Sequence, residues 1–161
     1  MSISVGDKIP AATVTTMTDE GPQPVNSEDF FSGRKVVMFG VPGAFTPTCH
    51  NQHLPGFVRH LDAIKAKGVD TIACLSVNDV FVLDAWAKAA GASDAVTFLA
   101  DGNAELTKAL GLELDASGFG MGTRSQRFSM IVDDGVVQAL NIEPQAGQAD
   151  VSSADTILDN L

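Results

Sequence analysis

The sequence predicts an α/β fold: a three-layer sandwich in which helices cover both faces of a central mixed β-sheet. Three observations lead to this prediction. Short β-branched runs alternate with segments of helical periodicity across residues 35–110, as in strands joined by crossover helices. Asp134-Gly135 lies between two further apolar runs, which is typical of a β-hairpin. The 161 residues suit a single domain spanning residues 1–161.

Each element is assigned from its own pattern. Strands are expected at the short apolar runs 12–17, 35–40, 71–77, 96–100, 127–132 and 136–140. Helices are expected at 47–67, 80–90, 104–110 and 153–161. Gly21–Pro24 predicts a turn, and Pro55 predicts a kink near 51–54 because proline lacks the N–H that a helix needs. Asn78 or Asp79 can cap the second helix.

The connections decide how these elements assemble. Right-handed crossovers between the early strands predict a mostly parallel sheet, with the hairpin antiparallel on one side. A thioredoxin-like arrangement fits this order of elements, and other α/β folds fit it as well.

The charge of the chain excludes some classes of partner. Acidic residues number 20 and basic residues 10, for a net charge of −10. Nucleic acids and anionic membranes bind clustered Lys and Arg, so neither is expected as a partner. The start, Met1–Lys8, lacks the regions of a signal peptide, and no apolar run is long enough to span a membrane. The cytoplasm is the expected location, and two cysteines, too few for a disulfide scaffold, fit a reducing compartment.

The segment from Gly40 to Cys49 leaves the expected central strand at its carboxyl end, where open α/β sheets bind ligands. Thr46 suits the N-cap of the next helix and Pro47 its first position, so Cys49 falls in the first turn. Free N–H groups and the positive end of the helix dipole favour a thiolate there, the nucleophilic form of cysteine. Thr46 lies one turn before the sulfur and can hydrogen-bond to it. The alternative is an ordinary helix start with Cys49 as a small structural residue.

Arg127 is the expected partner of that sulfur. It begins an apolar strand and shares a face with Ser129 and Ile131. Burial of an unpaired guanidinium is costly, and a thiolate would supply the missing negative charge. The alternative is a structural ion pair with a carboxylate. Arg124, in a looser Gly-rich segment, is expected to support Arg127 or the rim of the pocket.

The histidines and the second cysteine have less specific patterns. His53 shares a helix face with Cys49 and is expected to line the pocket entrance. His50 points away from that face, and His60 is expected at the surface. Because no CxxC or HxxxH pair occurs, we expect no metal ion, with a Cys/His metal site as the alternative. Cys74 lies inside an expected buried strand and is expected to be an inert core residue.

The run Pro42-Gly43-Ala44-Phe45-Thr46-Pro47-Thr48-Cys49 resembles the peroxiredoxin active-site motif, Pro-x-x-x-Thr-x-x-Cys. Three further runs, His53–Phe57, Ala73–Asp79 and Arg124–Met130, are similar to the atypical type-II subfamily of peroxiredoxins. Together these runs make the resemblance cover nearly the whole chain.

The resemblance implies a thioredoxin fold and a thiol peroxidase without a cofactor. Cys49 is then the peroxidatic cysteine, which attacks a hydroperoxide and becomes a sulfenic acid, and Thr46 is its hydroxyl partner. Pro42 shields the pocket, and Arg127 is the activating guanidinium. The substrate-binding candidates are Gly43, Thr48, His53 and Arg124.

The same resemblance carries expectations about partners. Some family members have a second reactive cysteine in the C-terminal loop, but residues 143–152 contain none. A one-cysteine cycle is therefore expected, with glutathione and glutaredoxin, or thioredoxin, as the reductant. The subfamily also implies a homodimer, for which Phe45 and Phe81, expected in loops near the site, are contact candidates.

Two other functions compete with the peroxidase. A cysteine hydrolase would need a general base beside Cys49 and a residue that orients it. His53 is the candidate for the base, and no Asn or Asp partner for it is evident. A thioredoxin-like thiol or metal-binding protein would have no peroxidase activity and would leave hydrogen peroxide unreacted.

Overall fold

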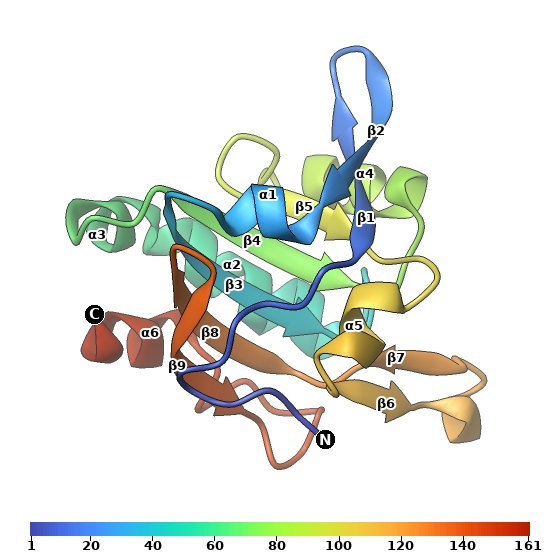
Figure 1. Cartoon of the computed structure of the whole chain (residues 1–161). Helices are drawn as coiled ribbons and strands as arrows, with labels where there is room; N and C mark the ends of the chain where they lie inside the picture. Colours follow the sequence, from blue (N-terminus) through green and yellow to red (C-terminus); the bar gives the residue numbers. More distant parts are fainter.

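A computed structural model describes residues 1–161, and a seven-stranded sheet lies at its centre (Figure 1). In spatial order the strands are β2 (Gly21–Asn26), β1 (Thr13–Thr18), β5 (Thr97–Ala100), β4 (Thr71–Ser76), β3 (Lys35–Val41), β8 (Phe128–Asp133) and β9 (Val136–Ile142). A separate hairpin pairs β6 (Glu113–Asp115) with β7 (Thr123–Ser125). The mixed sheet predicted from the sequence is confirmed.

The predicted predominance of parallel pairing is wrong. Only the β3–β4 and β4–β5 pairs are parallel, whereas the other four neighbouring pairs are antiparallel. Crossover helices specify parallel partners for the middle strands, but they do not say which edges β1 and β8 join. Gly21–Pro24, predicted as a turn, instead belongs to strand β2. Because β2 is at the edge of the sheet, it tolerates prolines that cannot donate a hydrogen bond.

Helices cover both faces of the sheet (Figure 1). They are α1 (Ser27–Phe31), α2 (Leu54–Arg59), α3 (Leu61–Ala66), α4 (Val80–Ala89), α5 (Glu105–Ala109) and α6 (Ala154–Asn160), with a π-helical turn η1 (Cys49–His53) and a 3₁₀ turn η2 (Ser117–Phe119). Side chains of α2, α3, α4 and α6 belong to one buried cluster, and those of α1 and α5 to another. The three-layer sandwich is therefore confirmed. None of these helices combines the length and the apolar composition that a membrane-spanning segment requires.

The alternation of side chains along β3 explains the two cores. Val37, Phe39 and Val41 belong to the cluster beneath α2 and α4, while Val36 and Met38 belong to the cluster beneath α1 and α5. Successive side chains of a strand point to opposite faces, so a continuous apolar run is required when both faces are covered. Full burial of each such side chain contributes roughly 1.5–3 kcal/mol to stability.

The predicted helix 47–67 is divided where its sequence predicts weakness. Residues 47–48 begin a helical turn that continues as η1 and then α2, with Pro55 in the first turn of α2. The kink is thus confirmed, as a π-helical turn just before the proline. A second break at His60, between α2 and α3, was not predicted. Asp79 rather than Asn78 caps α4, accepting the Val82 N–H at 2.9 Å.

The topology brings three chain segments to one edge of the sheet. β3 and β4 are parallel, so both carboxyl ends, Val41 and Ser76, lie there. β8 runs antiparallel to β3 and pairs Phe128 with Gly40. The residue before Phe128 is Arg127, so strand pairing places it beside the loop that follows β3.

Candidate active site

Cys49 lies at the start of η1 and is fully buried. Thr46 precedes the helical turn, and its carbonyl accepts the His50 N–H at 2.9 Å, which closes the first turn. The predicted helix start, with Cys49 in the first turn, is confirmed. The sulfur therefore lies at the carboxyl end of β3, on the core side of the sheet that α2 covers.

The Thr46 hydroxyl lies between two acceptors. Its Oγ1 is 2.8 Å from Cys49 Sγ and 2.7 Å from the Gly43 carbonyl oxygen. A hydroxyl has a single proton and can also accept a hydrogen bond. It can donate to a thiolate at Sγ, or donate to Gly43 while it accepts the S–H of a thiol. Thr46 can therefore keep a hydrogen bond to the sulfur in both protonation states of Cys49 without moving.

Arg127 is buried, and each of its three guanidinium nitrogens has a partner. Nη2 donates to Cys49 Sγ at 2.9 Å, Nη1 to His53 Nδ1 at 3.0 Å, and Nε to the Ala146 carbonyl at 2.8 Å. The ion pairs within 4.0 Å in the chain are His60–Asp155 and Lys88–Asp84. Arg127 thus has no carboxylate partner, and the structural ion pair considered above is wrong. The positive charge of Arg127, its Nη2 donor and the Thr46 hydroxyl all face the sulfur.

His53 lies deeper than the sequence predicts, because the C-terminal loop covers it. It is 2% exposed, and its Nε2 is 2.9 Å from the Ser152 carbonyl oxygen. A guanidinium can only donate and a carbonyl can only accept, so Nδ1 accepts from Arg127 and Nε2 carries the proton. Burial, followed by the charge of Arg127, lowers the pKa of His53 from 6.5 to about 3. His53 is therefore a neutral group that holds Arg127, not an entrance residue.

The buried neutral His53 predicts an acid-sensitive fold. In the unfolded chain His53 binds a proton near pH 6.5, whereas in the folded chain its pKa is about 3. Between these values the unfolded state binds more protons, so stability falls as the pH falls, by up to about 1.4 kcal/mol per pH unit. Urea unfolding between pH 7 and pH 4 should show this loss.

A matched pair of variants isolates the contribution of His53. His53→Gln removes the titrating ring, so its free energy of unfolding should fall less steeply with acid than that of the parent chain. His60→Gln removes a histidine that is only half-buried, and it should keep the steep dependence. Equal slopes in the parent chain and His53→Gln would show that the neutral His53 contributes nothing.

Hydrogen bonds hold the loop between β9 and α6 over the site. Thr48 Oγ1 donates to the Gly147 carbonyl at 2.8 Å, beside the Arg127 contact with Ala146. Glu143 is buried, and its Oε2 accepts from the Ser152 backbone N–H and hydroxyl at 2.7 and 2.6 Å. The expected substrate-binding candidate Thr48 therefore contacts this loop.

Arg124 contacts the loop that follows β3, next to Gly43. Arg124 Nε donates to the Met121 carbonyl at 2.9 Å, and Nη1 is 3.4 Å from the Pro42 carbonyl oxygen. A Cβ at Gly43 would lie 3.0 Å from Arg124 Nη1 and 3.3 Å from Thr46 Cγ2. A side chain at position 43 would therefore press on the guanidinium, which would have to shift by a few tenths of an ångström. Arg124 contacts the Pro42–Gly43 rim and not Arg127.

Sequence reasoning missed Asn78 as a support of the active-site loop. Its Oδ1 accepts the Ala44 N–H at 2.9 Å and the Ser76 hydroxyl at 2.6 Å. The available signal was its position just after β4, since the ends of parallel β3 and β4 lie side by side. Asn78 therefore ties the loop carrying the Pro-x-x-x-Thr-x-x-Cys motif to the neighbouring strand.

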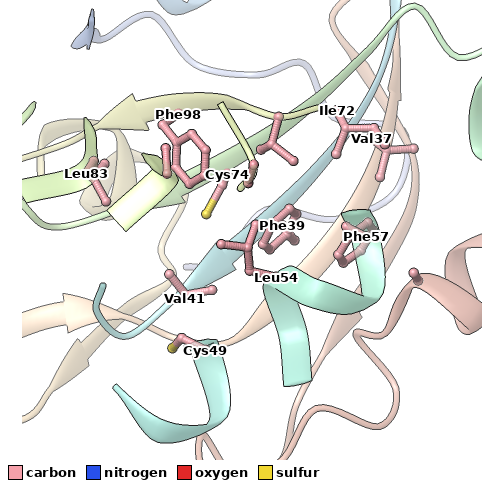
Figure 2. Packing of buried hydrophobic residues seen from close by; sticks show 14 of the residues in the cluster. Val37, Phe39, Val41, Cys49, Leu54, Phe57, Ile72, Cys74, Leu83 and Phe98 are labelled. Carbon is pink, nitrogen blue, oxygen red and sulfur yellow. The ribbon is translucent and has the colours of Figure 1, made fainter. Parts of the chain in front are cut away.

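Cys74 belongs to the same buried cluster as Cys49 but to a different element. It lies within β4, between Phe39 of β3 and Phe98 of β5 in the strand pairing. Figure 2 shows Cys74 near Phe98 and Leu83, and Cys49 beyond Val41 at the start of the helical turn. Burial raises the pKa of the Cys74 thiol well above its ordinary value. Both cysteines are free. The burial of Cys74 in the core agrees with the prediction, and its inertness stays a prediction.

The other histidines lie outside the site. His50 Nδ1 accepts a hydrogen bond from Trp86 Nε1 at 3.1 Å, and its ring centroid is 5.9 Å from that of Phe45. His60 forms the ion pair with Asp155. Across residues 1–161 no group of three His, Cys, Asp or Glu side chains could hold a metal ion.

Comparisons with known proteins agree with this geometry. A family model described as Redoxin matches residues 4–158. The chain is 49% identical over 165 residues to the chloroplastic peroxiredoxin-2E-2 of Oryza sativa subsp. japonica, covering 99% of this chain and 73% of the relative.

Two solved structures are similar over nearly their whole length. Reduced Prx3 of Vibrio vulnificus in complex with hydrogen peroxide is 52% identical, with 98% of each chain covered and a TM-score of 0.93. Peroxiredoxin 5 of Alvinella pompejana is 37% identical, with 98% and 97% coverage and a TM-score of 0.85. The buried cysteine between a threonine hydroxyl and an arginine agrees with these comparisons. The chain belongs to the Redoxin family and is one of its peroxiredoxins, which are thiol peroxidases.

Proposed function

We propose that this peroxidase follows a one-cysteine cycle of the atypical type-II kind. In it Cys49 reduces hydrogen peroxide or an alkyl hydroperoxide, and an external thiol restores the enzyme. The observation that carries the proposal is the sulfur of Cys49, fully buried between Thr46 Oγ1 at 2.8 Å and Arg127 Nη2 at 2.9 Å. The role for the cell would be antioxidant defence and redox homeostasis.

In the oxidative step the Cys49 thiolate attacks the terminal oxygen of the peroxide. An S–O bond forms as the O–O bond breaks, so the sulfur is oxidised by two electrons to a sulfenic acid. The leaving oxygen takes a proton and departs as water or an alcohol. Donors from Thr46 and Arg127 are within reach of the charge that develops on the oxygens, which lowers the barrier.

The position of Cys74 and the composition of the C-terminal loop both support an external reductant. Cys74 is held in β4 by pairing with β3 and β5, so it could join Cys49 in a disulfide only if one of the two segments moved. The loop at residues 143–152, where some relatives carry a second cysteine, has none. An outside thiolate would attack the sulfenic acid and expel hydroxide, forming a mixed disulfide. A second thiol would then displace the Cys49 thiolate and leave as an external disulfide.

The reductant we propose is glutathione with glutaredoxin, or thioredoxin. Because the sulfur of Cys49 is fully buried, the thiol of glutathione or of thioredoxin can reach it only after local movement at the start of η1. The short π-helical turn, whose backbone departs from the ordinary helical pattern, supports such an opening.

A homodimer in the cytoplasm completes the proposal. Phe45 is 50% exposed and Phe81 66% exposed, the latter in the first turn of α4 and not in a loop as predicted. Large exposed aromatic side chains favour protein contacts. Sedimentation analysis of the parent chain and Phe81→Glu would test this interface.

The proposed location is the cytoplasm. Two free cysteines fit a reducing compartment of this kind.

The decisive experiment follows peroxide consumption by the purified protein with glutathione plus glutaredoxin and, separately, with thioredoxin. We expect turnover with at least one system, and mass spectrometry of the oxidised form should show the reductant attached to Cys49. An intramolecular Cys49–Cys74 disulfide would contradict the one-cysteine cycle. It would leave the peroxidase chemistry itself intact.

The geometry does not favour the hydrolase alternative. A cysteine hydrolase needs a base that accepts the proton of the nucleophile. Both nitrogens of His53 are engaged, Nδ1 by Arg127 and Nε2 by the Ser152 carbonyl, and neither faces the sulfur.

A further inference from the structure

Arg124 is a guanidinium at the rim of the site that has no anionic partner. It is half-buried, and no carboxylate lies within 4.0 Å of it, because the chain's close ion pairs involve other residues. This is unexpected in a chain with 20 acidic and 10 basic residues. Its only protein acceptors are the carbonyls of Met121 and Pro42, which leaves Nη2 and its two protons unused.

The position of Arg124 is fixed beside the residues that contact the sulfur. Its Nη1, the Thr46 methyl and the Met121 methyl surround the face of Gly43, at 3.0, 3.3 and 3.4 Å from the point that a Cβ would occupy. Thr46 in turn contacts Cys49. A molecule that approached Cys49 past Gly43 would therefore come close to the Arg124 guanidinium.

Arg124 belongs to a different element from the sulfur. It lies in β7, in the hairpin with β6, and its contacts are with Met121 and the loop after β3. Opening of η1 would move Cys49 but would not require movement of this hairpin. The backbone that carries Arg124 is thus separate from the turn that carries the sulfur.

Arg127 cannot take the same role. All three of its guanidinium nitrogens are engaged, by Cys49, His53 and the Ala146 carbonyl. Arg124 is the neighbouring guanidinium with a free edge, and planar guanidinium groups bind carboxylates with paired hydrogen bonds.

We propose that Arg124 determines specificity by binding a carboxylate on the molecule that reacts with Cys49. This inference rests on the proposed peroxidase cycle and names a chemical feature of its substrates. The carboxylate can belong to the thiol that reduces the sulfenic acid or to an organic hydroperoxide. Both sources share the same recognition chemistry, and two arms of one experiment distinguish them.

The thiol arm compares two small reductants with the same two-carbon spacing, 3-mercaptopropionate, which is anionic, and 2-mercaptoethanol, which is neutral. Cys49 is first oxidised with one equivalent of hydrogen peroxide, which also verifies the proposed oxidative step in the parent chain. The rate of sulfenic acid loss is then measured for both thiols. In Arg124→Gln the ratio of the 3-mercaptopropionate rate to the 2-mercaptoethanol rate should fall by about 10-fold or more.

The peroxide arm compares an unsaturated fatty acid hydroperoxide with its methyl ester in the oxidation of reduced Cys49. A selective loss for the free acid in Arg124→Gln would assign the carboxylate to the peroxide, and a selective loss in the thiol arm would assign it to the reductant. Arg124→Lys keeps the charge without the planar pair of donors and should give a smaller loss.

Arg34→Gln is the matched control. Arg34 is exposed and lies just before β3, at the end of the strand opposite to Pro42, so this variant makes the same change in net charge far from the site. It should leave both ratios unchanged. If Arg124→Gln slows charged and neutral partners equally, or changes neither ratio, Arg124 only supports the Pro42–Gly43 loop and the proposal is wrong. Absence of any reaction of the parent chain with hydrogen peroxide would instead refute the proposed function.

Discussion

Cys49→Ser is expected to reduce peroxide-dependent thiol oxidation to background, a loss of at least about 1,000-fold. The hydroxyl of serine is far less nucleophilic than a thiolate and cannot form the sulfenic acid that the cycle requires. The replacement keeps the size and a hydrogen-bonding atom near Thr46 and Arg127, so the fold should persist. Consumption of hydrogen peroxide in the presence of excess reductant measures the effect.

Cys74→Ala is the matched control for this result. It removes the other sulfur from the same buried cluster and should cost about 1 kcal/mol of stability. Because Cys74 is sealed within the sheet with a raised pKa, turnover should remain close to that of the parent chain. Loss of activity in folded Cys74→Ala, judged by its thermal unfolding, would overturn the one-cysteine cycle.

Arg127→Ala is expected to slow the oxidation of Cys49 by about 100- to 1,000-fold. The change removes a donor 2.9 Å from the sulfur together with the buried positive charge that faces it. It also leaves His53 Nδ1 and the Ala146 carbonyl without a partner. Rapid-quench trapping of the remaining thiol after mixing with hydrogen peroxide gives the rate constant directly.

Arg127→Lys separates the charge from the geometry. A lysine keeps the positive charge, but its single ammonium cannot occupy the positions of three guanidinium nitrogens. Its rate should therefore fall between those of Arg127→Ala and the parent chain. Arg34→Ala, which removes an exposed arginine before β3, should react normally. A normal rate in folded Arg127→Ala would remove this residue from the peroxide chemistry.

Local patterns predicted most of the secondary structure. The Asp134-Gly135 pair predicted the β8–β9 hairpin, and both residues have the positive φ that its tight turn requires. The apolar run at Lys35–Gly40 predicted the central strand β3. The short hairpin of β6 and β7 was missed, since each strand has only three residues and neither has a continuous apolar run.

The active-site residues were predicted to different depths. Thr46 and Cys49 are three residues apart, so helix geometry alone predicted their contact. The contact between Arg127 and Cys49 joins residues 78 positions apart. From the sequence, Arg127 could be predicted only as a positive charge at the start of a buried strand that needs a negative partner. The orientation of His53 was not predictable from the sequence, because its partners, Arg127 and Ser152, come from the distant strand end and the C-terminal loop.

By itself the sequence determined the helix start at Cys49, the buried central strands, the hairpin turn and the acidic surface. Each of these depends on backbone preferences and side-chain spacing within a few neighbouring residues. The tertiary structure alone decided that β8 lies antiparallel beside β3, that Arg127 faces the sulfur, and that Arg124 keeps a free edge at the rim. Those outcomes depend on which distant segments pack and pair together, and the free energy that selects them is shared across the whole core.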